Sequence, residues 1–198
     1  MWETPPAAPT QPDDSSTPEY VPPARRSRRL REFADTLLLT AIIFLIVNAA
    51  TGRFLIQSVS MQPSLREGER VVVDKVSYLF RPPARGDIVV LDLQGEPEDL
   101  IKRVVGLPGE TIEIKDGSAL IDGRLLEEPY AQPSLGAIAA RQLGSDEYFV
   151  MGDNRVNSKD SRSFGPIRRE DIVGRAWIIY WPPSEWGFIP QPAYAEGG

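Results

Sequence analysis

The stretch that decides the fold is Thr111-Ile-Glu-Ile-Lys-Asp-Gly-Ser-Ala-Leu-Ile-Asp122. Its two arms, residues 111–115 and 119–122, are rich in apolar side chains, and Asp116-Gly117 lies between them. A two-residue hairpin turn needs positive φ at its central residues, and Asp-Gly is one of the dipeptides that adopt this conformation most readily. The stretch therefore predicts a β-hairpin and, with it, antiparallel strand pairing.

Further strand-like runs lie on both sides of this hairpin and are separated by Gly, Pro and Asp; they are residues 70–76, 87–91, 100–105, 148–151 and 176–181. Parallel strands would need helices between them, and almost no helical periodicity separates these runs. We therefore predict a mainly β protein in which residues 51–198 form an antiparallel β-sheet domain. Residues 127–144 lack a clear strand pattern, and we expect them to form a less regular excursion, a segment that leaves that sheet and returns to it.

The composition excludes several classes of function. The 198 residues include 22 Lys and Arg against 28 Asp and Glu, a net charge of −6, which lacks the basic footprint of a nucleic-acid-binding protein. There is no Cys, which excludes disulfides, thiolate nucleophiles and Cys-ligated metals. There is also no His, which excludes His-ligated zinc sites and any triad with an imidazole base. If the protein is a hydrolase, its base is Lys, Asp or Glu, or a metal-held water on carboxylates.

The first 50 residues differ in kind from the rest. Residues 1–23 hold seven prolines and few large apolar side chains, which predicts a disordered tail. This tail, taken as residues 1–32, ends in a basic cluster of Arg25, Arg26, Arg28, Arg29 and Arg31. Residues 33–50 follow as an apolar run in which only Asp35 is charged.

We interpret residues 33–50 as an uncleaved transmembrane anchor. The run is slightly short for the roughly 20 residues that span a bilayer, and Phe54, Leu55 and Ile56 could extend it. A secretory signal peptide and the buried helix of a soluble protein are the alternatives, although a polar preface of about 30 residues is long for a signal peptide. Because the arginines precede the run, the positive-inside rule places the tail in the cytoplasm and residues 51–198 outside it.

Lys102 is the most unusual charged residue of the strand-like segments. Strand alternation places it on the same face as Leu100 and Val104, among apolar neighbours. Such a lysine usually extends its amine to the edge of the apolar surface. If the amine is instead desolvated, its pKa falls, and the neutral form can take a proton from a serine hydroxyl. The serine-rich segment 57–65, directly after the apolar run, is a candidate source of that hydroxyl.

The polar segment 151–162 is a third candidate. It fails the spacing of a calcium-binding loop, so we expect no metal there. An ordinary loop rich in Asp and Asn is one interpretation. The other is an ion-paired scaffold that holds the Ser158 hydroxyl, built from Asp153, Arg155, Asp160 and Arg162.

Four blocks together make the chain recognisable. They are Ser60-Met-Gln-Pro-Ser-Leu65, Arg85-Gly-Asp-Ile-Val-Val90, Ile101-Lys-Arg-Val-Val-Gly-Leu-Pro-Gly109 and Gly152-Asp-Asn-Arg-Val-Asn-Ser-Lys-Asp-Ser-Arg162. In this order, behind an apolar helix, they resemble the type I signal peptidases. The resemblance runs from the anchor to about Trp181. It implies an antiparallel β catalytic domain with a second, smaller β-subdomain, which we expect to be reduced here, at about residues 110–145.

The resemblance also implies roles for individual residues. Ser60 matches the family's nucleophile and Lys102 its general base, while Ser58 and the Ser60 backbone N–H match the oxyanion hole. Ser158 matches the hydroxyl that orients the lysine amine. A supporting polar network corresponds to Asp153, Asp160, Arg162 and Arg103, and shallow apolar subsites correspond to Phe54, Ile56, Met61, Leu65, Val90 and Ile101. We expect neither a metal nor another cofactor.

Two positions depart from the family pattern. Ser64 stands where Thr is frequent, and Val156 stands where many members have Asp. The second departure removes one expected ion pair, and neither touches a catalytic role.

The function implied is removal of signal peptides from exported precursors, by cleavage after a small residue of an Ala-x-Ala site. The implied partners are these precursors, the lipid bilayer and nearby export machinery, with no nucleic acid. The implied location is the plasma membrane, crossed once. One rival is another Ser–Lys protease, such as a self-cleaving repressor, which would carry a DNA-binding domain. The other is a non-catalytic, membrane-tethered β domain that binds envelope partners, in which Ser60 and Lys102 would be accidental.

Overall fold

A computed structural model describes residues 25–192 and Tyr194; the tail predicted to be disordered, residues 1–23, lies outside the described residues. The first element is the helix α1, Arg25–Ala50. Its part Arg29–Ala50 is 22 residues long and apolar enough to cross a membrane. At 1.5 Å per residue this part is about 33 Å long, which matches a hydrocarbon core of about 30 Å.

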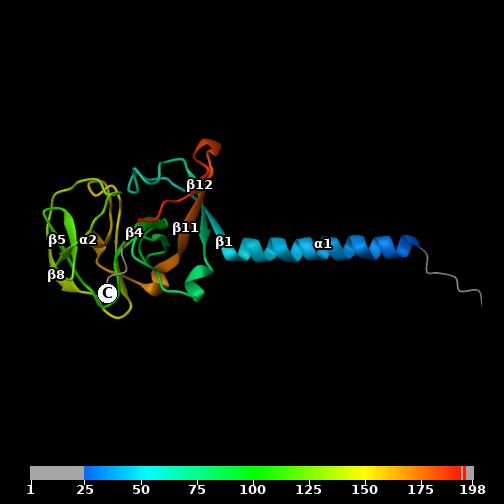
Figure 1. Cartoon of the computed structure of the whole chain (residues 1–198), viewed down its shortest axis with the longest axis horizontal. Helices are drawn as coiled ribbons and strands as arrows, with labels where there is room; N and C mark the ends of the chain where they lie inside the picture. Colours follow the sequence, from blue (N-terminus) through cyan, green and yellow to red (C-terminus); the bar gives the residue numbers. More distant parts are fainter. Residues whose placement is uncertain (1–24, 193, 195–198) are drawn as a thin grey trace, which may run out of the picture. The chain divides into compact units, whose positions relative to one another are not determined.

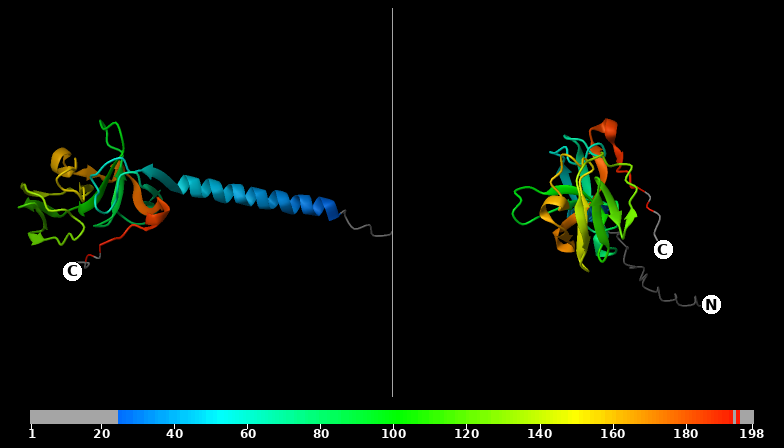
Figure 2. Two further views of the ribbon diagram at one scale, coloured as in Figure 1. Left: turned by 90° about the horizontal axis from the view of Figure 1, so that it is seen from above. Right: turned by 90° about the vertical axis from the view of Figure 1, so that its left-hand side faces the viewer.

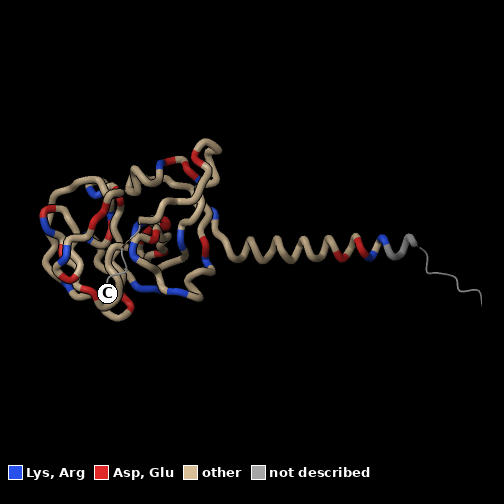
Figure 3. The backbone as a smooth tube through the Cα atoms, viewed as in Figure 1, with Lys and Arg blue, Asp and Glu red and all other residues tan. Residues whose placement is uncertain are grey.

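The membrane-compatible part of α1 carries few polar side chains, and its threonines bond within the helix. Residues 36–50 carry no Lys, Arg, Asp or Glu (Figure 3). The Thr40 hydroxyl donates to the Thr36 carbonyl at 2.8 Å, one helical turn earlier. In lipid no water is present to accept a hydrogen bond from the Thr40 hydroxyl, so a backbone carbonyl of the helix itself must accept it.

The compact unit that begins at Leu45 contains two antiparallel sheets. The larger sheet has the order β1-β2-β11-β3-β4-β9-β10, with β12 paired to β11 (Figure 1). Its strands are β1 Thr51–Leu55, β2 Arg70–Asp74, β3 Ile88–Leu91, β4 Leu100–Gly106, β9 Glu147–Met151, β10 Ile167–Arg168, β11 Ile172–Trp181 and β12 Gly187–Phe188. The prediction of a mainly β, antiparallel domain is confirmed.

The smaller sheet contains the hairpin that the sequence predicted. Its order is β7-β6-β5-β8, with β5 Thr111–Lys115, β6 Ser118–Ile121, β7 Arg124–Leu125 and β8 Ile138–Gln142. Asp116 and Gly117 have φ of 51° and 78°, as a two-residue hairpin turn requires. A side chain at Gly117 would also collide with the Ser134 carbonyl, 1.9 Å from the position of its Cβ. Glycine is therefore needed there for both conformation and space.

Several features of the strands differ from the sequence prediction. The helix α1 ends at Ala50 and residues 51–55 form β1, so Phe54, Leu55 and Ile56 do not extend the apolar helix. The short strands β7, β10 and β12 were not predicted. β8 lies inside residues 127–144, where the pattern indicated only a loose excursion. β11 begins at Ile172, four residues before the predicted start, because Gly174 and Arg175 pair with β3 despite their weak strand pattern. The connections contain four short helical turns, η1 Ser77–Leu79, α2 Ser161–Phe164, η2 Arg169–Asp171 and η3 Pro183–Glu185.

The two sheets share an apolar core. Ile112 and Ile114 of the smaller sheet pack with Phe149 and Met151 of β9 in one buried cluster. Within the β domain, β5 and β8 lie at the opposite end from β1 and β12 (Figures 1 and 2). β4 runs between these ends, and every residue from Ile101 to Gly106 is buried. Two of those residues, Lys102 and Arg103, are charged, and both belong to the candidate site.

Candidate active site

The centre of the candidate site is a contact between Lys102 and Ser60. The Lys102 Nζ lies 3.0 Å from the Ser60 Oγ and donates a second hydrogen bond, of 2.7 Å, to the Ile101 carbonyl. Lys102 is 2% exposed and Ser60 is 5% exposed. β4 supplies the lysine, and the turn that follows β1 supplies the serine, 42 residues earlier. A hydroxyl and a buried amine in such contact can exchange a proton.

The electrostatic environment favours the neutral amine. Burial lowers the pKa of Lys102 from 10.5 to about 8, and the negative charge of Asp160 partly opposes this shift. At pH 7 an amine with this pKa is neutral in roughly a tenth of the molecules, compared with about one in 3,000 for an unperturbed lysine. Lys102 can therefore act as a base near neutral pH, where an ordinary lysine cannot.

Two hydrogen-bond donors flank the Ser60 hydroxyl. The exposed Ser58 side chain places its Oγ 3.2 Å from the Ser60 Oγ. The backbone N–H of Ser60 donates no hydrogen bond within the described part of the chain. A free backbone N–H and a hydroxyl beside a nucleophile can together hold an oxyanion.

Ser158 lies close to this centre but is not bonded to the amine. Its Oγ is buried without a hydrogen bond of good geometry in the described structure. A Cβ added at Gly152 would lie 2.3 Å from this oxygen and 2.5 Å from the Ser60 carbonyl, so Ser158 and Ser60 meet across Gly152. In this structure the Lys102 amine is oriented by Ser60 and the Ile101 carbonyl.

Asp160 is held by a partner of its own. Both of its carboxylate oxygens accept from Arg162, each at 2.8 Å, and one also accepts from the Gly152 N–H at 3.0 Å. Burial works to raise the pKa of Asp160, but the hydrogen bonds from Arg162 and from the Gly152 N–H, together with the charge of Arg162, outweigh it and lower the pKa. Asp160 is therefore ionised and acts on Lys102 as a fixed negative charge.

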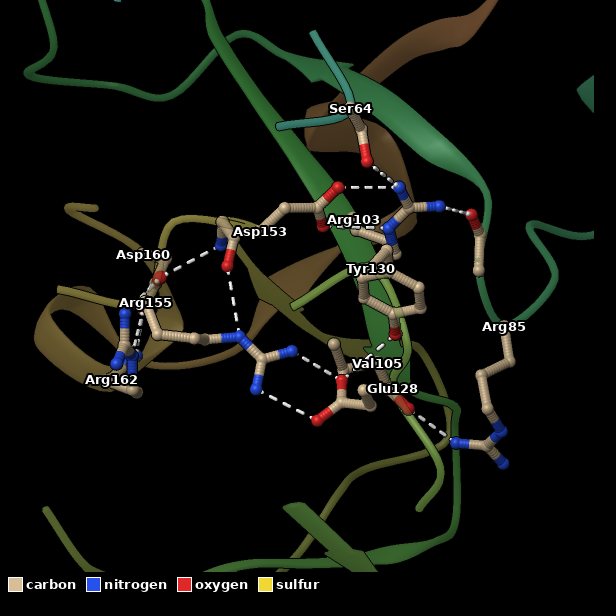
Figure 4. A network of polar contacts seen from close by, with 12 residues as sticks. Ser64, Arg85, Arg103, Val105, Glu128, Tyr130, Asp153, Arg155, Asp160 and Arg162 are labelled. Carbon is tan, nitrogen blue, oxygen red and sulfur yellow. Dashed lines mark hydrogen bonds and ion pairs between the residues drawn. The ribbon is translucent and has the colours of Figure 1, made fainter. Parts of the chain in front are cut away.

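A second ion pair joins Arg103 and Asp153 (Figure 4). Arg103, on the other face of β4 from Lys102, donates to both carboxylate oxygens of Asp153 at 2.8 and 2.6 Å. It also donates to the Gly86 carbonyl at 2.9 Å and to the Ser64 hydroxyl at 3.2 Å. Arg103 is 1% exposed and Asp153 is fully buried. The four residues expected to form the polar network thus form two separate ion pairs.

Sequence reasoning missed two partners of this network. Arg155 pairs with Glu128 and not with an aspartate of its own segment, at 2.9 and 2.5 Å. The ring of Tyr130 lies 4.0 Å from the guanidinium carbon of Arg103. Glu128 and Tyr130 belong to the excursion between β7 and β8, which has no periodic pattern that would have marked them.

A cleft of about 500 Å³ opens beside the Ser60–Lys102 contact. Lys102 and Ser58 line it, together with four of the six expected subsite residues, Phe54, Ile56, Val90 and Ile101. The other two, Met61 and Leu65, are fully buried in the core beneath it. They support the nucleophile turn from below and do not line the cleft.

The structure offers little for a metal ion. Within the part of the chain that it describes, no three carboxylates gather in a way that could hold one. In the polar segment 151–162 the two buried carboxylates, Asp153 and Asp160, are each paired with an arginine.

Comparison with known proteins connects this geometry to one family. Residues 30–181 match the family model described as signal peptidase, peptidase S26. A signal peptidase I from Leptolyngbya laminosa is 39% identical over 91% of this chain and 98% of its own length. The signal peptidase I U of Bacillus subtilis is 34% identical over 81% and 93% of the two chains.

More distant relatives carry the same name. The signal peptidase I of Mycobacterium tuberculosis is 30% identical over 84% of this chain and 77% of its own. A crystal structure of a signal peptidase I from Enterococcus faecalis is also 30% identical; it matches 48% of this chain and 97% of that one, with a TM-score of 0.40.

Proposed function

Because the chain belongs to the signal peptidase family, peptidase S26, we propose that Ser60 and Lys102 form the catalytic dyad with which it removes signal peptides from exported precursor proteins. The protein is a serine peptidase of the signal peptidase I type, anchored in the membrane by one N-terminal apolar helix. The observation that carries the assignment of the dyad is the 3.0 Å contact between a nearly buried lysine and a serine hydroxyl.

Catalysis begins when the Lys102 amine is neutral. The Ser60 Oγ–H then donates its hydrogen bond to Nζ, and Oγ attacks the scissile carbonyl carbon as its proton moves to the amine. The C–N bond of the tetrahedral intermediate breaks, and the leaving amine takes the proton back from Lys102. Water, deprotonated by the neutral Lys102, then attacks the carbonyl carbon of the acyl-enzyme ester. The C–O bond to Ser60 breaks as Lys102 returns the proton to Oγ, which releases the signal peptide with a new carboxyl group and regenerates the free enzyme.

The oxyanion of each tetrahedral intermediate is held by the Ser60 N–H and the Ser58 hydroxyl. Both donors are available beside the Ser60 Oγ in the free protein. Loss of one such donor typically costs about 3 kcal/mol of transition-state stabilisation. Ser158, buried next to Asp160 and Ser60, is the hydroxyl that would take over the orientation of the Lys102 amine once substrate covers the site.

The cleft binds the residues that precede the scissile bond. Its apolar walls, formed by Phe54, Ile56, Val90 and Ile101, meet the site next to Lys102. Small side chains of the Ala-x-Ala type fit such a shallow surface. Among the strands that the structure describes, β1 pairs only with β2 and so has a free edge. An extended peptide can add to this edge by main-chain hydrogen bonds.

The domain layout follows from the same assignment. Residues 1–32 form a cytoplasmic tail, 33–50 the anchor and 51–198 the extracytoplasmic peptidase domain, with 110–145 as its small inserted β-subdomain. The arginine cluster before the anchor supports this orientation. Ser60 lies ten residues beyond Ala50, and ten extended residues reach at most about 35 Å, so the nucleophile stays near the outer membrane face. There it meets precursors as the export machinery delivers them.

A cleavage assay on the full chain in detergent or lipid tests the dyad. Wild-type protein should convert a precursor with an Ala-x-Ala site to its mature form. Ser60→Ala and Lys102→Ala should each abolish conversion, and the double variant should be no worse than either single variant. Lys115→Ala, on the exposed end of β5, is the matched control and should retain activity. Substantial turnover by Lys102→Ala would assign the base to another residue, and activity in Ser60→Ala would refute the nucleophile.

Orientation is tested separately with a reporter fused after Gly198. A reporter that is active only outside the cytoplasm should be active in this fusion. Cytoplasmic activity of the fusion would overturn the orientation and leave the dyad untouched.

A further inference from the structure

We propose that Asn154 is a positioning residue of the oxyanion hole, which sets the direction of the Ser60 backbone N–H. This inference rests on the proposed function, in which that N–H binds the oxyanion. Asn154 follows Asp153 in the segment after β9 and is 5% exposed. It does not line the cleft, so any effect on catalysis must act through the residues that it contacts.

Asn154 binds the peptide groups on both sides of the nucleophile. Its side-chain Nδ2 donates to the Val59 carbonyl at 3.3 Å, and its backbone N–H donates to the Ser60 carbonyl at 3.0 Å. These two carbonyls belong to the peptide units before and after the Ser60 Cα. One residue therefore restrains both backbone torsions of the nucleophile.

The first of these bonds acts directly on the oxyanion donor. The Val59 carbonyl and the Ser60 N–H are two ends of one planar, trans peptide group, so they point in opposite directions. Fixing the direction of the carbonyl fixes the direction of the N–H. The Val59 carbonyl also accepts from the Gln62 N–H at 3.1 Å, so both of its lone pairs are occupied. The Ser60 N–H itself is left free within the described residues, as an oxyanion donor must be.

A third contact fixes which end of the Asn154 amide faces the nucleophile. The Asn157 N–H donates to the Asn154 Oδ1 at 3.2 Å. Because Oδ1 is the acceptor in this bond, Nδ2 must be the end that faces Val59. The same side chain thereby connects the nucleophile turn to the loop that leads to Ser158.

The test compares two substitutions that remove the Nδ2 donor in different ways. Asn154→Ala removes the side chain without adding charge, and Asn154→Asp keeps its shape and its acceptor for Asn157. Both retain the backbone N–H that binds the Ser60 carbonyl. The matched control is Asn157→Ala, because the exposed Asn157 contacts Asn154 only through its backbone. All four proteins are assayed as full chains on a signal-peptide substrate, with thermal unfolding of each measured alongside.

We expect kcat to fall about tenfold to a hundredfold in both Asn154 variants, less than the loss of an entire oxyanion donor. KM should not change in either variant, because the cleft is intact. The apparent pKa of the rising pH–rate limb should not change in Asn154→Ala, because this substitution adds no charge near Lys102. The affinity for a substrate-like peptide aldehyde, whose adduct with Ser60 carries the oxyanion, should fall by the same factor as kcat. Asn157→Ala should match wild type.

Several outcomes would overturn the inference. Full kcat in either Asn154 variant would show that the Nδ2 bond does not matter. A loss of kcat with unchanged aldehyde affinity in either variant would place the defect at another step, and a shifted apparent pKa in Asn154→Ala would place it at Lys102. If kcat falls only in proportion to the fraction of each variant that is unfolded, the role of Asn154 is purely structural. If wild-type protein fails to cleave the substrate at all, the proposed function fails instead.

Discussion

The buried amine of Lys102 should make the stability of the β domain depend on pH in a way that one substitution can isolate. Its pKa falls from 10.5 to about 8 in the folded protein because burial disfavours the charged form. The difference is about 2.5 pH units, which corresponds to roughly 3 kcal/mol at about 1.36 kcal/mol per unit. Lys102 is 2% exposed, so water screens this penalty little.

The sign of the effect follows from proton binding. Between pH 8 and 10.5 the unfolded chain holds a proton on Lys102 and the folded chain has lost it. The unfolding free energy therefore rises with pH across this window, by up to about 3 kcal/mol, and this contribution is constant below and above it. Below pH 8 the folded protein carries the full cost of a charged amine in the core.

The measurement is the urea-induced unfolding of the detergent-solubilised full chain at several pH values between 7 and 10.5. Lys102→Met keeps the unbranched side chain and removes the titrating group. We expect the unfolding free energy of wild type, minus that of Lys102→Met, to increase by about 3 kcal/mol from pH 7.5 to 10.5. Lys115→Met, at an exposed position, should show no such trend relative to wild type.

The same titration should govern activity, because only the neutral amine accepts a proton from Ser60. The rate should rise about tenfold per pH unit below pH 8 and level off above it. If wild type and Lys102→Met have parallel stability profiles, Lys102 is not desolvated. If the rate instead rises toward pH 10.5, the amine has its ordinary pKa, and in either case the reasoning is refuted.

Three other predictions follow from the packing around the dyad. Gly152→Ala should reduce kcat about a hundredfold with little change in KM, because the new Cβ would lie 2.5 Å from the Ser60 carbonyl; equal kcat values for the variant and wild type would contradict this. Arg103→Met should lower the unfolding free energy by about 3–5 kcal/mol, because it leaves the buried Asp153 carboxylate unpaired. Adding Asp153→Leu should restore most of this loss. If urea titrations show that the two substitutions lower the unfolding free energy additively, the unpaired carboxylate is not the cause. Ser158→Ala should slow cleavage sharply while leaving the melting temperature within a few degrees of wild type, since its buried hydroxyl has no well-formed bond to lose; a rate equal to wild type would remove Ser158 from the site.

Much of the fold could be predicted from local sequence, because the features concerned are local. The hairpin at residues 111–122 is encoded by Asp116-Gly117 and the apolar arms beside it, which suit the required φ values whatever surrounds them. The apolar helix is encoded in the same way, by a run of 15 residues without Lys, Arg, Asp or Glu, residues 36–50, inside a 22-residue segment apolar enough to cross a bilayer. The place of Lys102 among apolar residues on a buried strand was also predictable, since strand alternation depends only on spacing.

Other elements have no such local signature. β8 forms because Ile138 and its neighbours meet the exposed edge of β5, and β11 extends to Ile172 because β3 offers it partners. The Arg155–Glu128 pair joins residues 27 apart, one of them in a segment without periodicity. Strand pairing and ion pairing at such separations depend on which surfaces the chain brings together, and a sequence window does not contain that information.

The candidate site shows the same division. The residue types, and the absence of His and Cys, were determined by the sequence alone, and they left a lysine as the base available to a serine nucleophile. Only the tertiary structure decided that Ser60 and Lys102 lie 3.0 Å apart, that Met61 and Leu65 belong to the core beneath the cleft, and that Asn154 binds both peptide groups around the nucleophile. The physical reason is that a pKa, a proton transfer and an aligned N–H depend on distance and desolvation. Both arise when segments that are far apart in the chain are buried against one another.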